Sequence, residues 1–471
     1  MSFRSGIAPL PRAHADDPGA GNAPIAAAGQ ALAASAARLP HPPSVLIATS
    51  TRSGAPRVAM AFAELGCHVE AICWFRGPLA RTRAVRRTHR YGPLRPLAAL
   101  RRTLARMQPD LVVPCDDRAV SHLLALHDHL IAAGEPVPAA VIARSLGDLA
   151  AMRAVAGRAA FAALARAAGV RAPLTLAVAD MGQLRAAIGR VGLPAMLKLD
   201  GTWGGTGVVR VDSLAEAERA FARLSARPGA LRAVKRLAVN RDPFWLLPWL
   251  HGERPRVNVQ AFVAGRPANC VVSCQQGEVL AIIQAEVLAT RHPTGPAAVV
   301  RIVDQAEMAA AARRIVARCG MSGFCGLDFV IEEATGALHL IEMNPRITPL
   351  GHLALDRGRD PVGALVARHV GRGGPARAPT TAAEVVAFFP QAWWLDPANP
   401  DLAAAYHDVP WTEPGLVREL VRLSPWDRGW LARRIESGRI ESGRAGRPPA
   451  PAPRRVAMIE TLLRRAAADD A

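Results

Sequence analysis

The chain has 471 residues, half of them hydrophobic, so it is long enough for two or three domains with a large buried core. Its formal net charge of +19 comes almost wholly from arginine, since Lys198 and Lys235 are the only lysines. The arginines are spread along an Ala-, Pro- and Gly-rich sequence, which argues against a nucleic-acid surface as the main feature of the chain.

Cysteine usage and hydropathy exclude further classes of protein. The seven cysteines form no CxxC pair and have no histidine at finger-like spacing, which indicates buried free thiols rather than zinc ligands. No apolar run reaches the roughly 18 residues that span a bilayer. The Ala-rich stretch 26–37 follows an acidic Asp16-Asp17 pair, whereas a signal peptide places a basic region before its apolar core. We therefore expect a cytoplasmic protein.

The amino-terminal third predicts a leader followed by a parallel α/β domain. Residues 1–43 have few large apolar side chains and predict a flexible leader, because they cannot offset the entropy of ordering a backbone. Residues 44–147 alternate buried strands with helices, which predicts a parallel sheet with crossover connections. Ligands of such sheets bind at the carboxyl ends of strands, so loops 49–54 and 115–118 are either pocket walls or plain connectors. The expected strands are 45–48, 69–74 and 111–114, and the expected helices are 57–65 and 97–107.

Residues 148–370 predict an α+β block. In the domain before it, His122, His127 and His129 are expected to form a solvated helix face. The expected helices are 148–168, 214–224 and 308–319; the expected strands lie within 193–212, at 257–263 with a hairpin partner at 270–274, and at 279–287, 326–331 and 338–343. Residues 371–430 predict a carboxyl-terminal extension with a strand in 385–394 and helices at 400–406 and 414–423. Residues 431–471 contain a tandem Arg-Ile-Glu-Ser-Gly repeat and a Pro-rich run, which predict a linker and tail.

Two segments carry residues suited to phosphate and metal chemistry. Lys198 ends a predicted strand and precedes the glycine loop 201–207, where backbone N–H groups can approach phosphate oxygens closely. Asp328 and the run Glu342-Met343-Asn344-Pro345-Arg346 lie on two adjacent apolar strands. Hard divalent cations take carboxylate and amide oxygens as ligands, so this pair of strands predicts a magnesium site. The alternative is an internal ion pair, such as Asp328 with Arg346.

The order and spacing of these features over residues 150–370 resemble the ATP-grasp superfamily. Its members have a strand with a lysine before a mobile glycine-rich loop, then an adenine-contacting hinge strand, then an acidic residue on one strand and Glu-x-Asn-x-Arg on the next. The resemblance implies an amino-terminal parallel α/β domain of the kind that precedes ATP-grasp modules, at 44–147, and a two-subdomain ATP-grasp fold at 148–370.

The resemblance also implies roles for individual residues. Phosphates would be contacted by Lys198 and by the backbone of Gly204, Gly205 and Gly207. One or two Mg²⁺ or Mn²⁺ ions would be held by Asp328, Glu342 and Asn344, and Arg346 would neutralise the transferring phosphoryl group or the substrate carboxylate. The adenine would be contacted along the hinge at Gln260, Ala261, Phe262 and Val263.

The chain departs from the family pattern at two places. Arg158 stands where many relatives have a lysine, and it retains the charge while adding bidentate phosphate contact. After Gly265 many relatives have an acidic residue for the ribose hydroxyls, whereas this chain has Arg266-Pro267-Ala268-Asn269, with Asn269 as the candidate substitute. Candidate substrate contacts are Glu286, Arg291 and His352.

The expected activity is an ADP-forming carboxylate-amine ligase that uses ATP and Mg²⁺ on small-molecule carboxylate and amine substrates, with a homodimer as one expected assembly. The alternative that the sequence leaves open is an ATP-binding regulatory protein without turnover, motivated by the missing acidic ribose contact. A third hypothesis, an arginine-rich nucleic-acid binder, predicts tight binding that is sensitive to salt.

Overall fold

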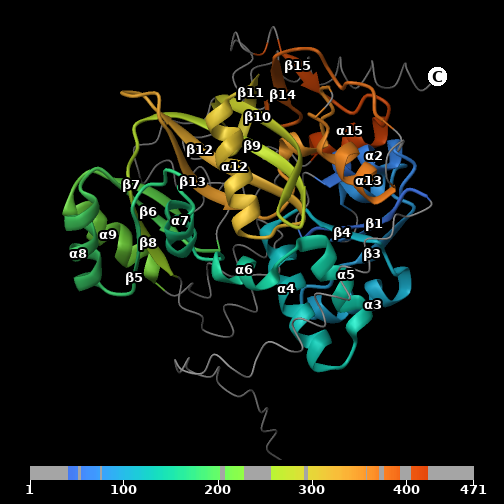
Figure 1. The fold of residues 1–471 in the computed structure, drawn as a ribbon, viewed down its shortest axis with the longest axis horizontal. Coiled ribbons are helices and arrows are strands. Elements are labelled where there is room, and N and C mark those ends of the chain that lie inside the picture. The colour runs from blue at the N-terminus through green and yellow to red at the C-terminus, as the bar shows by residue number, and fades with distance from the viewer. Residues whose placement is uncertain are drawn as a thin grey trace, which may run out of the picture. The chain divides into compact units, whose positions relative to one another are not determined.

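The computed structural model describes residues 41–50, 55–74, 77–201, 207–226, 256–290, 295–356, 358–370, 376–392, 402 and 405–422. Three sheets organise these residues (Figure 1). The predicted leader 1–43 lies outside the described residues except for residues 41–43, and the predicted linker and tail 431–471 lie wholly outside them. Among the described helices, none has the length and apolar character needed to cross a membrane.

The amino-terminal sheet is wholly parallel, as the alternation of strands and helices predicted. Its strand order is β3-β2-β1-β4. The strands are β1 (Ser44–Ala48), β2 (His68–Cys73), β3 (Arg87–Arg90) and β4 (Leu111–Pro114). The accompanying helices are α2 (Ala55–Glu64), η1 (Pro78–Arg81), α3 (Pro96–Met107), α4 (Asp117–Ala132) and α5 (Pro136–Leu146).

Alternating side chains of β1 enter two different cores, which is why the strand is apolar throughout. Val45 and Ile47 pack in one cluster with α2 and with α13 (Pro361–Val370), a helix from the far end of the chain. Leu46 and Ala48 pack in a second cluster with α3, α4 and α5. The amino-terminal sheet is therefore covered on both faces, and one of its layers is supplied by the module that follows it in sequence.

A small antiparallel sheet, of order β5-β8-β6-β7, follows the helices α6 (Leu149–Ala154) and α7 (Arg158–Ala167). Its strands are β5 (Thr175–Val178), β6 (Ala195–Leu199), β7 (Val208–Val211) and β8 (Val257–Ala261). The helices α8 (Met181–Val191) and α9 (Leu214–Ser225) share a core with it. The predicted hairpin between β8 and residues 270–274 is wrong, because β8 pairs with β5 and β6 while the next strand joins another sheet.

The largest sheet has seven strands in the order β13-β12-β9-β10-β11-β14-β15. They are β9 (Gly265–Gln275), β10 (Glu278–Thr290), β11 (Ala297–Val303), β12 (Gly323–Glu332), β13 (Leu338–Asn344), β14 (Val385–Phe388) and β15 (Tyr406–Asp408). All neighbouring strands are antiparallel except β14 and β15. Two strands beyond residue 370 thus complete this sheet, followed by α15 (Pro414–Arg422).

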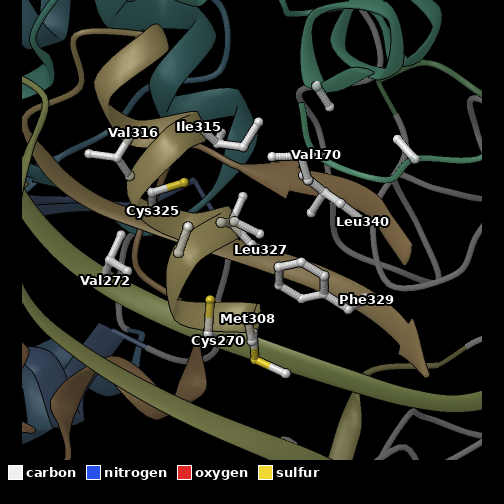
Figure 2. Packing of buried hydrophobic residues seen from close by; sticks show 14 of the residues in the cluster. Val170, Cys270, Val272, Met308, Ile315, Val316, Cys325, Leu327, Phe329 and Leu340 are labelled. Carbon is white, nitrogen blue, oxygen red and sulfur yellow. The ribbon is translucent and has the colours of Figure 1, made fainter. Parts of the chain in front are cut away.

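One face of the large sheet is covered by α12 (Ala306–Arg318). Figure 2 shows Met308 and Ile315 of this helix against Leu327 and Phe329 of β12. The opposite face of the sheet has its own apolar cluster, which includes Val271, Ile283 and the short helix η3 (Pro349–His352). The pleat of each strand therefore decides which side chains enter the α12 core and which point to the other face.

Three local predictions need correction. The predicted helix 148–168 is two helices, because Asp148 caps α6 and Gly157 begins α7 after a break. The predicted solvated His122 is half-buried, with Nδ1 2.7 Å from the Tyr91 hydroxyl, and burial lowers its pKa to about 4. Tyr406, predicted at the end of a helix, begins β15.

Candidate functional site

Lys198 lies near the end of β6 and its side chain is buried. The strand is fixed on both edges, with Lys198 opposite Val208 on β7 and Asn258 on β8. Burial lowers the pKa of the lysine to about 8, and Arg158 contributes to the decrease, while the negative charges of Glu342 and Asp328 oppose it. These couplings place the lysine among the charged groups of α7, β12 and β13.

Arg158, the first residue of α7, connects the small sheet to the large one. Its Nη1 donates to the carbonyl of Leu199 at 2.6 Å, and its Nη2 donates to Oε1 of Glu342 at 2.9 Å. The carboxylate of Asp200 lies 3.6 Å from Nη1 and accepts a hydrogen bond of 2.8 Å from Nδ2 of Asn258. Arg158, itself a predicted phosphate contact, therefore joins the end of the strand that carries Lys198 to the predicted metal ligand Glu342.

Asp328 and Glu342 face each other across β12 and β13, as the predicted hairpin requires. A β-bulge in this pair inserts Ile341 between the residues opposite Asp328 and Phe329. Consequently Leu340 enters the α12 core, whereas Glu342 points to the same face of the sheet as Asp328. Asn344 lies one step along β13 and donates from Nδ2 to Oδ2 of Asp328 at 2.9 Å.

Asp328 is partly buried beside the carboxylate of Glu342, and both conditions raise the cost of ionising it. Burial, and then repulsion from Glu342, raise the pKa of Asp328 to about 6, although the hydrogen bond from Asn344 and the charges of Arg346 and Lys198 act in the opposite direction. The proposed ion pair of Asp328 with Arg346 is not the one formed: Nε of Arg346 donates to Oδ1 of Asp117 at 3.0 Å.

This donor set fits a hard divalent cation that also binds phosphate oxygens. Asp328 and Glu342 offer two carboxylates, and Asn344 adds an amide oxygen, which accepts from Nη2 of Arg346 at 3.0 Å. Among the described residues no group of three histidine, cysteine, aspartate or glutamate side chains could hold a metal ion by itself. Mg²⁺ is typically held by one or two carboxylates, with the remaining positions filled by water and nucleotide phosphates. A cation here would also relieve the repulsion that raises the pKa of Asp328.

The hinge between the small and the large sheet follows β8. The Gln260 side chain is buried and donates from Nε2 to Thr175 Oγ1 at 2.9 Å, and the N–H of Ala261 donates to the carbonyl of Leu174 at 2.9 Å. Both groups are therefore engaged within the small sheet. The ring of Phe262 lies 4.5 Å from the guanidinium carbon of Arg210, a cation–π contact that fixes one face of this ring.

Of the predicted substrate contacts that the structure describes, Glu286 and His352 have partners away from the carboxylates. Glu286 lies opposite Ala268, whose side chain enters the α12 core, so Glu286 points to the other face of the sheet from Asp328. Its nearest cationic partner is Arg266, at 3.7 Å. His352 is buried, with Nε2 2.8 Å from Oδ2 of Asp408. Glu286 therefore lies on the other face of the sheet from the paired carboxylates, and His352 pairs with β15.

Some predicted residues lie outside the described residues, namely Gly204, Gly205 and Arg291. Gly207 is described, with φ +78, a backbone conformation that favours glycine, and its carbonyl accepts from the N–H of Leu199 at 2.9 Å. It therefore closes the loop onto the strand that carries Lys198.

Four polar residues at the site have contacts that the sequence did not predict. Three of them had no predicted role, and Asn269 was predicted as a ribose contact. Asp200 and Asn258 hold Arg158, and only the alternation of Asn258 with Gln260 on an apolar strand signalled an inward polar side chain. Asn269 lies beside Asp328 in the register of β9 and β12, and its buried Oδ1 has no hydrogen-bond partner among the described residues. Asp117 comes from the amino-terminal domain, and no feature of the sequence linked it to Arg346.

A small antiparallel sheet carrying a lysine, a hinge, and a larger sheet carrying paired carboxylates together define the ATP-grasp fold. The family comparison agrees: residues 157–354 match the family described as the carbamoyl-phosphate synthase L chain, ATP binding domain. Over residues 157–354 the chain therefore matches an ATP-grasp family, in agreement with its fold. A comparison with curated proteins found no match.

Solved structures share this fold at low sequence identity. Biotin carboxylase from Campylobacter jejuni is 15% identical with a TM-score of 0.51, over 71% of this chain and 72% of that chain. Carboxyaminoimidazole ribonucleotide synthase from Aspergillus clavatus, complexed with ATP, is 18% identical with a TM-score of 0.50, over 69% and 77%. Pyruvate carboxylase from Rhizobium etli is 19% identical with a TM-score of 0.49, over 71% of this chain, which spans only 29% of that chain.

Proposed function

We propose that this chain is an ADP-forming ligase that activates a small carboxylate with Mg-ATP and joins it to an amine. The observation that carries the proposal is the charged cluster at the meeting of the two sheets, where Lys198 is buried within electrostatic reach of Glu342, Asp328 and Arg158. A cluster of buried charges is costly to maintain without a ligand that neutralises it, and Mg-ATP carries both signs of charge.

Each charged or polar side chain of the cluster has a defined task in this reaction. Lys198 and Arg158 bind phosphate oxygens from the small-sheet side, where Arg158 is already anchored on the carbonyl of Leu199. Asp328, Glu342 and Asn344 would hold Mg²⁺, which would supply positive charge to the phosphates. Arg346 stabilises the charge on the phosphoryl group in transfer, because phosphoryl transfer depends mainly on positioning and electrostatic stabilisation.

The chemistry proceeds in two substitutions. A carboxylate oxygen attacks the γ-phosphorus, the bond from that phosphorus to the β–γ bridging oxygen breaks, and ADP leaves. The amine nitrogen then attacks the acyl carbon, loses its proton to a base, and displaces inorganic phosphate. ATP is required because a free carboxylate is a poor electrophile at neutral pH. The proposal is supported by the shared fold of a biotin carboxylase and a carboxyaminoimidazole ribonucleotide synthase, whose structures are named as complexes with beta-gamma-ATP and with ATP.

The test is ADP and phosphate release from the full chain with Mg-ATP and pooled carboxylic and amino acids, with mass spectrometry of new adducts. We expect ADP formation that depends on one acid, together with a condensed product. The matched control is Glu307→Ala, which removes a carboxylate paired with Arg171 at 2.9 Å on the far side of α12 and leaves the site intact. ATP binding without turnover under every acid would favour the regulatory alternative.

A further inference from the structure

Arg346 is the only residue of the Glu-x-Asn-x-Arg run whose described contacts extend into the amino-terminal domain. All three nitrogens of its guanidinium have acceptors: Nη2 donates to Asn344 Oδ1 at 3.0 Å, Nη1 to the carbonyl of Ile347 at 3.4 Å, and Nε to Asp117 Oδ1 at 3.0 Å. Two of these acceptors are neighbours of Arg346 in sequence. The third acceptor, Asp117, lies 229 residues away in sequence, at the start of α4 in the amino-terminal domain.

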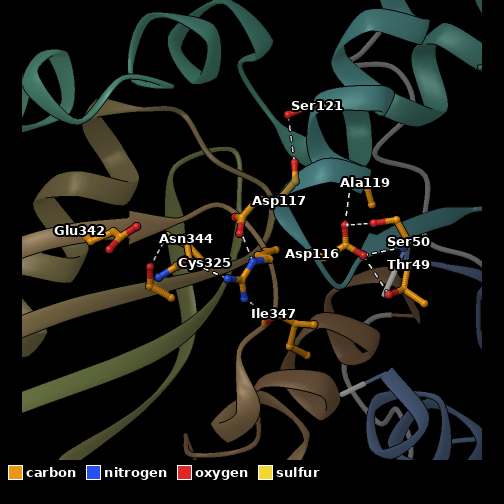
Figure 3. Close-up of polar contacts among 12 residues, drawn as sticks. Thr49, Ser50, Asp116, Asp117, Ala119, Ser121, Cys325, Glu342, Asn344 and Ile347 are labelled. Atoms are coloured by element: carbon orange, nitrogen blue, oxygen red, sulfur yellow. Dashed lines mark hydrogen bonds and ion pairs between the residues drawn. The ribbon is translucent and has the colours of Figure 1, made fainter. Parts of the chain in front are cut away.

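The carboxylate of Asp117 is directed by its place at the start of α4. Asp116 immediately before it caps this helix by accepting from the N–H of Ala119 at 2.9 Å. Asp116 also accepts from the Thr49 hydroxyl at 2.9 Å and from the N–H of Ser50, which ties the start of the helix to the end of β1. Figure 3 shows Asp116 turned toward Thr49 and Ser50, and Asp117 turned the other way, toward β13.

The two adjacent aspartates thus have separate tasks. Asp116 is nine-tenths buried and satisfies its own domain, so its removal would damage the fold. Among the described residues, Asp117 hydrogen-bonds within its own domain through its backbone carbonyl, which accepts from the Ser121 hydroxyl at 3.0 Å, whereas its side chain, 34% exposed, pairs with Arg346. A side chain whose hydrogen bond is made to an active-site arginine of another domain is suited to positioning that arginine.

We propose that Asp117 is a positioning residue for Arg346, so that the amino-terminal domain completes the catalytic site of the ATP-grasp module. This rests on the proposed function of Arg346. Without Asp117, the Nε–H of Arg346 loses its acceptor and the guanidinium is fixed only through its two terminal nitrogens, both bound to residues of its own loop. The side chain then populates several rotamers, and its charge is no longer directed at the transferring group.

A structural role would have different consequences. If Asp117 served only to dock the amino-terminal domain on the module through Arg346, its loss would lower the melting temperature and the nucleotide affinity and would leave kcat nearly unchanged. A positioning role acts on the reaction alone and only through Arg346. The two roles are therefore separated by a double-mutant cycle with kcat, KM for ATP and melting temperature as readouts.

The experiment uses the full chain as wild type and as Asp117→Ala, Asp117→Asn, Arg346→Ala and the double variant Asp117→Ala with Arg346→Ala. We expect Asp117→Ala to lower kcat by about 10- to 100-fold, with KM for ATP changed by less than about threefold, since misplacing a group by about 1 Å can cost about 10²-fold. Asp117→Asn, which keeps an acceptor oxygen, should retain more activity than Asp117→Ala. In the Arg346→Ala background, the loss of Asp117 should change kcat by less than about twofold.

A second readout does not require turnover. Phenylglyoxal modifies accessible guanidinium groups, and peptide mapping by mass spectrometry gives the rate at Arg346 relative to Arg171, which pairs with Glu307 elsewhere. Asp117→Ala should raise the relative rate at Arg346, whereas Glu307→Ala should raise the rate at Arg171 only. If no acid elicits ADP formation, the reaction assignment fails while this readout still decides the positioning. Equal additive losses in both backgrounds, or unchanged reactivity at Arg346, would overturn the proposal.

Discussion

From the pKa of Asp328 we predict by how much this carboxyl group lowers the free energy of unfolding of the protein without ligand. The folded protein keeps a proton on this carboxyl up to a pH of about 6, whereas the unfolded chain loses it near the ordinary value of 3.8. Between these values the folded state binds more protons than the unfolded state, so stability falls as pH rises through this window, and the loss is complete above it.

The replacement Asp328→Asn removes this loss because an amide does not ionise. The difference between 3.8 and about 6 corresponds to roughly 3 kcal/mol, which the variant should gain over the wild type at pH 7.5 but not at pH 4. The new side chain can be accommodated: its oxygen can accept from Nδ2 of Asn344, as Asp328 does, and its amide group stands in register with Asn269, whose Oδ1 lacks a partner among the described residues.

The assay is unfolding by urea, followed by circular dichroism, at pH 4 and pH 7.5 in the presence of EDTA and without nucleotide. The matched control is Asp408→Asn. Burial would raise the pKa of Asp408 as well, but the charges and hydrogen bonds of His352 and Arg57 hold this pKa below its ordinary value. Its ionised form therefore stabilises the fold, and its replacement should destabilise the protein at pH 7.5, the opposite sign from Asp328→Asn.

The reasoning is refuted if Asp328→Asn is no more stable than the wild type at pH 7.5, or if its advantage is the same at both pH values. The same variant should lose most ADP formation, because an uncharged amide binds Mg²⁺ more weakly than a carboxylate does. Increased stability together with lost turnover would identify the carboxylate pair as a functional feature that the fold tolerates at a cost.

Three further predictions concern neighbouring residues. Glu342→Gln and Asn344→Ala should lower the rate of ADP formation on the order of 10² to 10³ with the fold retained, as a coupled-enzyme assay and circular dichroism would show; near-normal turnover in either variant would remove its metal role. Arg158→Gln should weaken ATP binding by roughly 10- to 100-fold, since a charge-assisted hydrogen bond contributes about 1.5–3 kcal/mol, and Arg158→Lys should retain most of the affinity in calorimetry; equal losses would contradict a phosphate contact. Because the pKa of Lys198 is about 8, this side chain loses its proton as pH rises through that value, so ATP affinity should weaken by up to about tenfold per pH unit above it. The variant Lys198→Arg should lack this dependence between pH 7 and 9.5, and a flat wild-type profile would show that Lys198 does not bind phosphate in its charged form.

The sequence by itself determined which segments form the site, because the signals are local. A strand ending in Lys198 before a glycine loop, and two apolar strands carrying Asp328 and Glu342 joined by a short turn, depend on side-chain alternation and turn chemistry within about 20 residues. The parallel amino-terminal sheet was predictable for the same reason, since its strands and crossover helices alternate along the chain.

Only the tertiary structure decided which side chains meet, because that depends on register and on contacts between distant segments. The bulge at Ile341 aims Glu342 at Asp328 while Leu340 stays in the core, and the pleat of β10 turns Glu286 away from them. The partner of Arg346 is Asp117, contributed by a helix of another domain. No local pattern encodes such a pairing. The free energy that selects it comes from packing the two domains together, and the residues next to Asp117 or Arg346 in sequence carry no sign of it.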